Sequence, residues 1–309
     1  MQPAPLYNEM AQGPKDAAGY WIMADDNIRL RIAVWPEGAK GTVLMFPGRS
    51  EHAEKYGPPA AQLQGMGYAS IAIDWRGQGL SDRLWHDRHL GHVDDFSDYQ
   101  RDVQAMLGAV RALNLPEPLY LLTHSMGGCI GLRALHNGLP VRAAVFSAPM
   151  WGIEMAPYLR PVAWGLSTAL RPFTARYNYA PTTGPGTYVL KEAFDQNQLT
   201  NDPDMYAFMQ RHAQAVPDIH VGGPSIHWLN RALVEIRALH KMPSPRTPAA
   251  IVLGAQESIV TPARAQNRAA RWGNATLTII PDAKHEVMME RPPARQAFYD
   301  IVQGLFDAP

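Results

Sequence analysis

Short apolar runs, each bounded by Gly, Pro or polar residues, recur along the first half of the chain. Runs of this length and composition predict strands, and several are continuously apolar, as strands buried on both faces of a parallel sheet are. The predicted strands cover residues 28–35, 42–46, 69–74, 119–123 and 141–147.

Segments with helical spacing separate these strands. We predict helices over residues 56–66, 96–113 and 126–136, the last of them ended by Gly138 and Pro140. The alternation breaks at Pro149, because residues 150–245 contain amphipathic stretches and many prolines but no convincing strand. We interpret residues 150–245 as an inserted, mainly helical cap.

Strand and helix patterns resume after this insertion, with strands over 249–254 and 276–280 and helices over 262–272 and 294–306. The same alternation on both sides of an insertion indicates one α/β fold rather than two independent domains. We therefore expect a mostly parallel, doubly wound sheet in a core made of residues 1–149 and 246–309.

Composition and charge argue against some classes of protein, such as nucleic-acid-binding and disulfide-rich secreted proteins. The 309 residues are 46% hydrophobic and 18% charged, and 28 basic residues balance 28 acidic ones, so no global field attracts nucleic acid. The single Cys129 rules out an internal disulfide framework, and the N-terminal segment lacks the pattern of a secretory signal. We expect a cytoplasmic protein, with peripheral contact to the inner face of the membrane and the oligomeric state left open.

Ser125 lies between an apolar run and a helical run, in the stretch Thr123-His124-Ser125-Met126-Gly127. A serine at a sharp strand-to-helix turn is exposed for nucleophilic attack, and such a turn needs small residues because the strand and helix backbones pass close together. Gly127 supplies the downstream small residue, whereas Thr123 departs from the usual upstream glycine. The alternative is that Ser125 only caps the following helix.

A serine nucleophile requires a base and an acid on loops after later strands. His285 follows the final predicted strand and is the expected base. Glu257 follows the preceding strand and is the expected acid, which would fix the tautomer of His285 and stabilise the imidazolium. The competing acids are Asp74, at an earlier strand end, and Asp282, which is uncomfortably close to His285 along the chain.

Two backbone N–H groups are needed to hold the negative charge that develops on the substrate. We expect one from Met126, the residue after the serine, and one from Arg49, because Pro47 has no N–H. The Arg49 side chain is expected to pair with Glu51 or Glu54 rather than with substrate.

Several segments taken together resemble one family, the α/β-hydrolases of the monoacylglycerol lipase and bacterial lysophospholipase L2 group. They read FPGRSEHAEKYGPPAAQLQGMGYASIAIDWRGQGLSDR, GHVDDFSDYQRDV, LLTHSMGG, LGAQESIV and PDAKHEVMMER. The resemblance implies an α/β-hydrolase core, no cofactor, and hydrolysis of monoacylglycerols or lysophospholipids. Its catalytic pattern falls on Ser125, Glu257 and His285, with backbone donors at Arg49 and Met126.

The function we expect is therefore that of a serine esterase acting on a single-chain lipid ester through an acyl-enzyme. A peptidase of the proline iminopeptidase type is an alternative, which predicts acidic cap residues such as Glu154 or Glu192 facing the site. A broad-specificity carboxylesterase and a non-enzymatic fold relative are further alternatives. The apolar cap segment 150–173 serves either core packing or an acyl-chain tunnel.

Three histidines at three-residue spacing precede the helix over 96–113, and they raise the alternative of a metal site. Structural hydrogen bonding is the favoured interpretation, and no metal is expected. The three histidines are His86, His89 and His92.

Overall fold

A nine-stranded sheet forms the centre of the computed structural model, which describes residues 1–156 and 158–309, with the side chains of 159 and 160 left aside. Pro157, within the predicted cap, lies outside the described residues. The strand order is β1-β2-β3-β5-β4-β6-β7-β8-β9. The first three strands pair antiparallel and β3 pairs antiparallel with β5, whereas all pairs from β5 to β9 are parallel. This confirms the predicted mostly parallel sheet.

Most of the predicted strands are present within a few residues of the expected bounds. The strands are β1 (Gln2–Ala4), β2 (Ala18–Met23), β3 (Arg29–Ala39), β4 (Thr42–Phe46), β5 (Tyr68–Asp74), β6 (Leu119–His124), β7 (Ala144–Ser147), β8 (Ala249–Gly254) and β9 (Ala275–Ile280). The prediction missed β1 and β2, which form the antiparallel edge of the sheet. It also began β7 three residues early.

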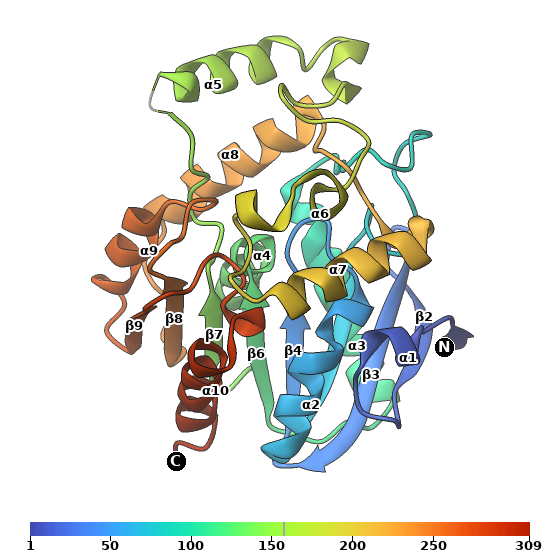
Figure 1. The fold of residues 1–309 in the computed structure, drawn as a ribbon, viewed down its shortest axis with the longest axis vertical. Coiled ribbons are helices and arrows are strands. Elements are labelled where there is room, and N and C mark those ends of the chain that lie inside the picture. The colour runs from blue at the N-terminus through green and yellow to red at the C-terminus, as the bar shows by residue number, and fades with distance from the viewer. Residues whose placement is uncertain (157) are drawn as a thin grey trace.

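Helices cover both faces of this sheet (Figure 1). Alternate residues of β4 point to opposite faces, so Leu44 and Phe46 belong to one apolar cluster and Val43 and Met45 to the other. The first cluster also contains side chains of α3 (Tyr99–Ala112), α4 (Met126–His136) and α9 (Pro262–Ala269). The second contains side chains of α2 (Gly57–Gly65) and α10 (Pro292–Phe306). The sheet is thus wound on both sides, as the predicted fold class requires.

The chain leaves the sheet after β7 and returns to it at β8. Between these strands it forms α5 (Leu159–Ala169), α6 (Tyr188–Lys191), α7 (Pro203–Ala215) and α8 (Ile226–Lys241), together with short 3-10 turns. Figure 1 shows α5 as the outermost helix, beyond α8. We propose that residues 150–245 act as a cap over the core formed by 1–149 and 246–309. None of the helices within the described residues combines the length and the apolar character of a membrane span.

Candidate active site

Ser125 occupies a strained turn between β6 and α4. Its φ of 49° and ψ of −115° lie outside the regions that ordinary residues favour, and such strain collects at functional sites. A Cβ at Gly127 would collide with the carbonyl oxygen of Phe46, so the turn requires glycine there. The Ser125 side chain makes no capping hydrogen bond to α4, and the helix-cap alternative is therefore wrong.

Thr123 is accommodated at the upstream position by a second glycine. Its side chain is fully buried, and its hydroxyl donates to the carbonyl oxygen of Val145 at 3.3 Å. A Cβ built on Gly131 of α4 would lie only 2.8 Å from Thr123 Cγ2. The methyl group of Thr123 thus fills space that Gly131 leaves open, and the turn keeps its shape.

His285 and Glu257 meet at the carboxyl edge of the sheet, after β9 and β8. His285 Nδ1 lies 2.7 Å from Glu257 Oε2, and both side chains are almost fully buried. The other oxygen of Glu257 accepts the backbone N–H groups of Ile259 at 2.7 Å and Val260 at 3.0 Å. Burial opposes the charged form, but the hydrogen bond from His285 and its charge hold the pKa of Glu257 below its ordinary value. Glu257 is therefore a fixed, ionised partner for one ring nitrogen of His285.

One of the two competing acids is engaged in an ion pair, and the other is exposed. Asp74 forms a buried ion pair with Arg31 at 2.7 Å and accepts the backbone N–H of Ala53 at 2.8 Å. Asp282 is exposed, in a left-handed turn with a φ of 52°. The described residues give His285 no carboxylate hydrogen bond other than that of Glu257.

Of the three histidines in the loop before α3, His92 forms side-chain hydrogen bonds. His92 Nδ1 lies 2.8 Å from Ser225 Oγ, and its Nε2 lies 3.3 Å from Asp94. No grouping of metal-ligand atoms that includes His86, His89 or His92 exists among the residues described. This supports the hydrogen-bonding interpretation.

The loop after β4 is clamped beside the serine turn. Trp75 Nε1 donates to the carbonyl oxygen of Pro47 at 2.9 Å. Gln78 accepts the N–H of Ser50 at 2.9 Å and donates to the carbonyl oxygen of Gly48 at 3.1 Å. The backbone N–H of Arg49 is left without an acceptor among the described residues.

The backbone N–H of Met126 likewise has no acceptor in the part of the chain that the structure describes. It is the first residue of α4, where N–H groups have no partner within the helix and the positive end of the helix dipole is located. Two N–H groups without acceptors among the described residues therefore lie in the serine turn and in the loop beside it, as the predicted oxyanion hole requires.

The predicted partners of the Arg49 side chain were wrong. Glu54 pairs with Arg31 at 2.6 Å, and Glu51 pairs with Lys55. Arg49 Nη1 instead donates to Ser50 Oγ at 2.8 Å and to the carbonyl oxygen of Gly222 at 2.9 Å.

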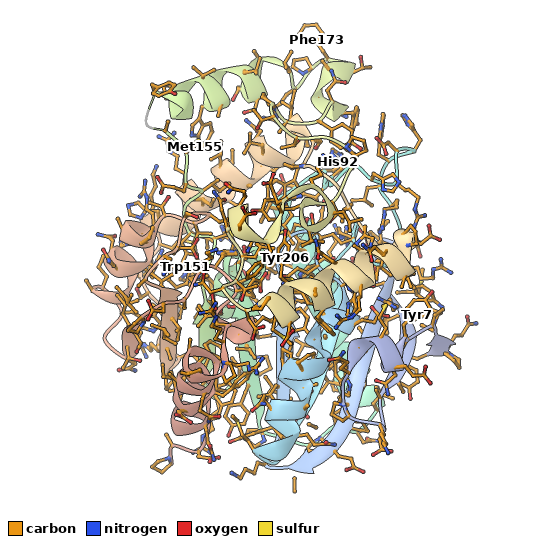
Figure 2. All side chains as sticks on the ribbon, viewed as in Figure 1. Tyr7, His92, Trp151, Met155, Phe173 and Tyr206 are labelled. Carbon is orange, nitrogen blue, oxygen red and sulfur yellow. The ribbon has the colours of Figure 1, made fainter. Side chains whose placement is uncertain are left out.

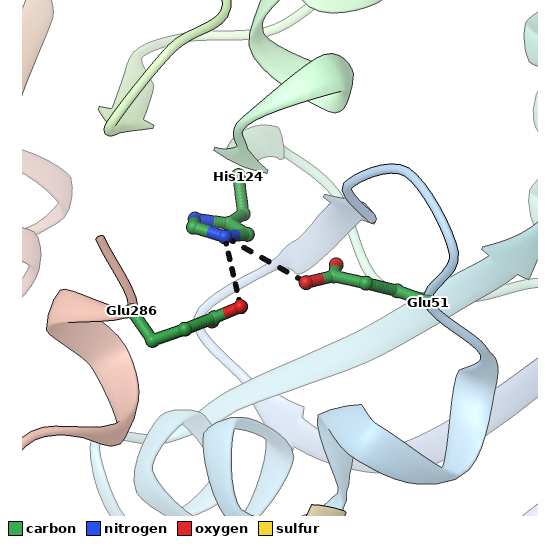
Figure 3. Close-up of side chains that lie close together, drawn as sticks. All are labelled: Glu51, His124 and Glu286. Atoms are coloured by element: carbon green, nitrogen blue, oxygen red, sulfur yellow. Dashed lines mark ion pairs between the residues drawn. The ribbon is translucent and has the colours of Figure 1, made fainter. Parts of the chain in front are cut away.

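A buried cluster of charged side chains adjoins Ser125 and His285 and lines the same cavity, and Figure 3 draws three of its members. We call Glu51, Lys55, His124 and Glu286 the ion-pair cluster. His124 Nε2 lies 3.2 Å from Glu286 Oε1 and 3.6 Å from Glu51 Oε1. Lys55 Nζ donates to the same two carboxylate oxygens, at 2.5 Å for Glu286. The cluster touches the site twice, because Glu51 accepts the Gly48 N–H and the rings of His124 and His285 are 4.7 Å apart between centroids.

The pKa shifts in this cluster favour the charged forms. Burial opposes charge on His124, but Glu286 and Glu51 hold its pKa above the ordinary value. Burial likewise opposes ionisation of Glu286, whereas His124 and Lys55 hold its pKa well below the usual range. Each charge is therefore stabilised by an opposite one at close range.

The same cluster is the one grouping of possible metal ligands among the described residues. Ligand atoms of Glu51, His124 and Glu286 lie within 4.8 Å of one another. The ammonium group of Lys55 already bridges the two carboxylates, however, and supplies the positive charge that a cation would bring. We interpret the group as an ion-pair network and not as a metal centre.

Sequence reasoning missed this cluster, although a signal was present. His124 directly precedes Ser125, and Glu286 directly follows His285. Each of these ionisable residues is next to an expected catalytic residue and lies at or after the carboxyl end of a strand. This placement would have pointed to a shared buried environment.

A cavity of about 470 Å³ contains the serine and the histidine. Its wall includes Ser125, His285 and Arg49 from the core, and cap residues between Thr182 and Gly223. The described residues of segment 150–173 contribute nothing to this wall, so the acyl-tunnel alternative for that segment is not supported. Trp151 instead packs in the core and donates to the carbonyl oxygen of Gly128 at 3.0 Å.

A parallel sheet wound on both sides, with a strained serine turn, a histidine–carboxylate pair and two free N–H donors at its carboxyl edge, defines an α/β-hydrolase. The family model described as "Serine aminopeptidase, S33" matches residues 37–292. The chain belongs to this family and is a serine hydrolase.

Curated relatives match most of the chain. A probable lysophospholipase L2 of Haemophilus influenzae is 30% identical over 281 residues, covering 89% of this chain and 88% of the relative. Lysophospholipase L2 of Escherichia coli is 30% identical over 277 residues, covering 86% and 80%.

Solved structures share the fold at lower identity. A soluble variant of monoglyceride lipase from Saccharomyces cerevisiae, in complex with a substrate analogue, superposes with a TM-score of 0.71 at 20% identity, covering 93% of this chain and 94% of that one. A monoacylglycerol lipase from Paleococcus ferrophilus gives 0.68 at 19% identity, covering 90% and 98%.

Proposed function

We propose that the chain hydrolyses carboxylic esters of single-chain lipids through an acyl-enzyme on Ser125. The observation that carries the proposal is one cavity that joins a strained serine to a histidine held by a buried carboxylate. Apolar side chains in the same wall would receive an acyl chain, namely Val189, Leu199, Met209 and Ile259.

In the first half of the reaction, Ser125 Oγ attacks the ester carbonyl while His285 Nε2 takes its proton. Glu257 keeps the proton on His285 Nδ1 and stabilises the imidazolium. The Arg49 and Met126 N–H groups hold the oxyanion of the tetrahedral intermediate. The intermediate collapses when His285 gives its proton to the leaving alcohol, and the acyl group stays on Ser125.

In the second half, water loses a proton to His285 and attacks the acyl-enzyme. The same N–H groups hold the second oxyanion, and His285 returns the proton to Ser125 Oγ as the fatty acid leaves. Every proton is carried by one imidazole, so this scheme uses no metal or organic cofactor.

The names of the curated relatives that match most of the chain support a lipid substrate, since both relatives are named as lysophospholipases L2. A panel of lysophospholipids, monoacylglycerols and short-chain esters tests the proposal, run on the parent and on Ser125→Ala. We expect the parent to prefer the long-chain lipids and Ser125→Ala to lose at least about a thousandfold in kcat. Equal turnover by both proteins would contradict the assignment of Ser125.

A peptidase is the second candidate, favoured by one observation. Glu192 lines the cavity, where a carboxylate could bind a free amino terminus, whereas Glu154 does not. Lys191, the preceding residue, also lines the cavity, however, and carries the opposite charge. Turnover of an aminoacyl anilide faster than that of monoacylglycerol would favour this candidate over the esterase.

Peripheral contact with a membrane forms part of the proposal, because lipid substrates reside there. Exposed apolar side chains gather on and near α5, the outermost helix, and Figure 2 labels Phe173 at that end of the molecule. The exposed fractions are 58% for Val162, 41% for Leu166 and 63% for Phe173. We propose that this end contacts the lipid surface.

A further inference from the structure

Arg49 carries a half-buried positive charge that the described residues leave without a carboxylate partner. Its Nη1 is held by Ser50 Oγ and the carbonyl oxygen of Gly222, and its guanidinium lies 5.8 Å from the ring centroid of Trp228. Its Nε and Nη2 make no hydrogen bond to the described residues, and Arg49 is part of the cavity wall. Burial lowers the pKa of Arg49 to about 10, which fits the lack of a neighbouring carboxylate.

The other charges of the cavity wall are balanced. The ion-pair cluster contains two carboxylates and two basic side chains, and it neutralises itself when His124 is protonated. Lys191 and Glu192 are adjacent in the chain and carry opposite charges. Of the described lining cations, Arg49 and the exposed Lys191 form no ion pair, and Arg49 is the half-buried one. A ligand that brings an anion would therefore meet no competing carboxylate at this guanidinium.

The anion of a lysophospholipid is spaced to reach this group. As many bonds join the ester carbonyl carbon to the phosphorus of a 1-acyl lysophospholipid as join the backbone nitrogen of Arg49 to its guanidinium carbon. The backbone N–H would hold the oxyanion at one end, so the guanidinium can meet the phosphate at the other. Guanidinium groups bind phosphate oxygens through paired N–H donors, which a lysine ammonium cannot reproduce.

We propose that the Arg49 side chain binds the headgroup phosphodiester of a lysophospholipid and makes the enzyme prefer this substrate to a neutral monoacylglycerol. The inference rests on the proposed esterase function and names the substrate class of the same site.

The test compares kcat/KM for 1-palmitoyl lysophosphatidylethanolamine and 1-palmitoylglycerol in micelles of one neutral detergent. We expect the ratio of the two constants to fall at least about tenfold in Arg49→Gln and to fall less in Arg49→Lys. Arg211→Gln is the matched control, since Arg211 is exposed on α7 and outside the cavity wall, and its ratio should stay that of the parent.

The ratio separates headgroup recognition from damage to the oxyanion hole, because a displaced Arg49 backbone would lower both constants alike. An unchanged ratio in Arg49→Gln would overturn the inference, and so would an equal fall in Arg211→Gln. If the parent hydrolyses neither lipid, the proposed function itself fails, and that result is distinct from an unchanged ratio.

A second test uses the parent protein alone, so it does not depend on whether a variant folds. We expect sn-glycerol 3-phosphate to inhibit hydrolysis of p-nitrophenyl butyrate competitively, and at concentrations where glycerol does not. Equal inhibition by glycerol and glycerol 3-phosphate, or by neither, would contradict a phosphate subsite next to Ser125.

Discussion

Both carboxylate oxygens of Glu257 are engaged in hydrogen bonds. One oxygen accepts two backbone N–H groups, and the other faces His285 at 2.7 Å. We predict that Glu257→Gln lowers kcat on a lipid ester by about 10²- to 10⁴-fold, because the amide cannot stabilise the imidazolium. Steady-state kinetics measure the loss, and Asp282→Asn, a change to an exposed neighbour, should keep parental activity. If kcat fell in Asp282→Asn and stayed parental in Glu257→Gln, the assignment of Glu257 as the acid would be wrong.

The ion-pair cluster makes a second prediction, on stability and pH. The folded-state pKa of His124 is raised, so its stabilising contribution is complete below about pH 6.5 and is lost as pH rises through the raised value. The folded-state pKa of Glu286 is depressed, so its contribution is present above about pH 4.3 and is lost as pH falls through the depressed value.

Denaturant unfolding of the parent and His124→Asn at several pH values measures this contribution. We predict that the difference in unfolding free energy between the two proteins is largest between about pH 4.5 and 6.5 and shrinks at higher pH. A difference that grows above pH 7 would mean that His124 is neutral in the folded protein.

At the scale of single residues, the sequence predicted some side-chain contacts better than others. The sequence predicted that Ser125, Glu257 and His285 would lie together because each follows a recognisable strand, and strand ends of a parallel sheet converge at one edge. The structure pairs Glu257 with His285 and places Ser125 and His285 in one cavity wall, and their catalytic roles stay a prediction. The partners of Arg49 were not found, because Glu51 and Glu54 are nearby in sequence yet face Lys55 and Arg31 instead. Side-chain pairing depends on directions that local spacing does not contain.

Among the elements, the contact between β6 and α4 explains the unusual Thr123. We predict that Gly131→Ala destabilises the parent by about 1–3 kcal/mol, because the new Cβ would press against Thr123 Cγ2. In a Thr123→Gly background the same change should be neutral or stabilising by up to about 1 kcal/mol, since alanine favours helices.

A double-mutant cycle by denaturant unfolding measures this coupling. Gly108→Ala on α3 is the matched control, because a Cβ there meets nothing within 4 Å and should stabilise slightly. Additive effects of Thr123→Gly and Gly131→Ala would show that the two positions do not compensate each other.

Element prediction succeeded where the pattern was continuous. β4 and β8 have the predicted bounds because buried parallel strands are apolar throughout and end at Gly, Pro or polar residues. The sequence did not predict β1 and β2, because β1 has three residues and β2 mixes glycine and aromatic residues. Both strands belong to the antiparallel edge of the sheet, where neither face requires a continuous apolar run. Their antiparallel pairing is a tertiary feature that periodicity does not reveal.

For the whole molecule, the exposed apolar end near α5 predicts binding to lipid surfaces. Val162 and Leu166 lie one helical turn apart, and we expect Val162→Glu/Leu166→Glu to weaken binding at least about tenfold, because the burial of two apolar side chains is lost. Cosedimentation with vesicles of phosphatidylethanolamine and phosphatidylglycerol measures this.

Ile279→Glu is the matched control, since Ile279 is 45% exposed on β9. This strand belongs to the α/β part of the chain and not to the cap. It should bind vesicles as the parent does. Equal binding by the parent and the α5 variant would contradict membrane contact through this end of the molecule.

The central claim is that Ser125 is the nucleophile, activated by His285. Labelling with a fluorophosphonate, followed by peptide mass spectrometry, tests it most directly. We predict one adduct, on the peptide that contains Ser125, absent in Ser125→Ala, at least about a hundredfold slower in His285→Ala, and unchanged in Ser97→Ala, which alters an exposed serine. An adduct on another residue, or equal labelling of Ser125→Ala and the parent, would contradict it.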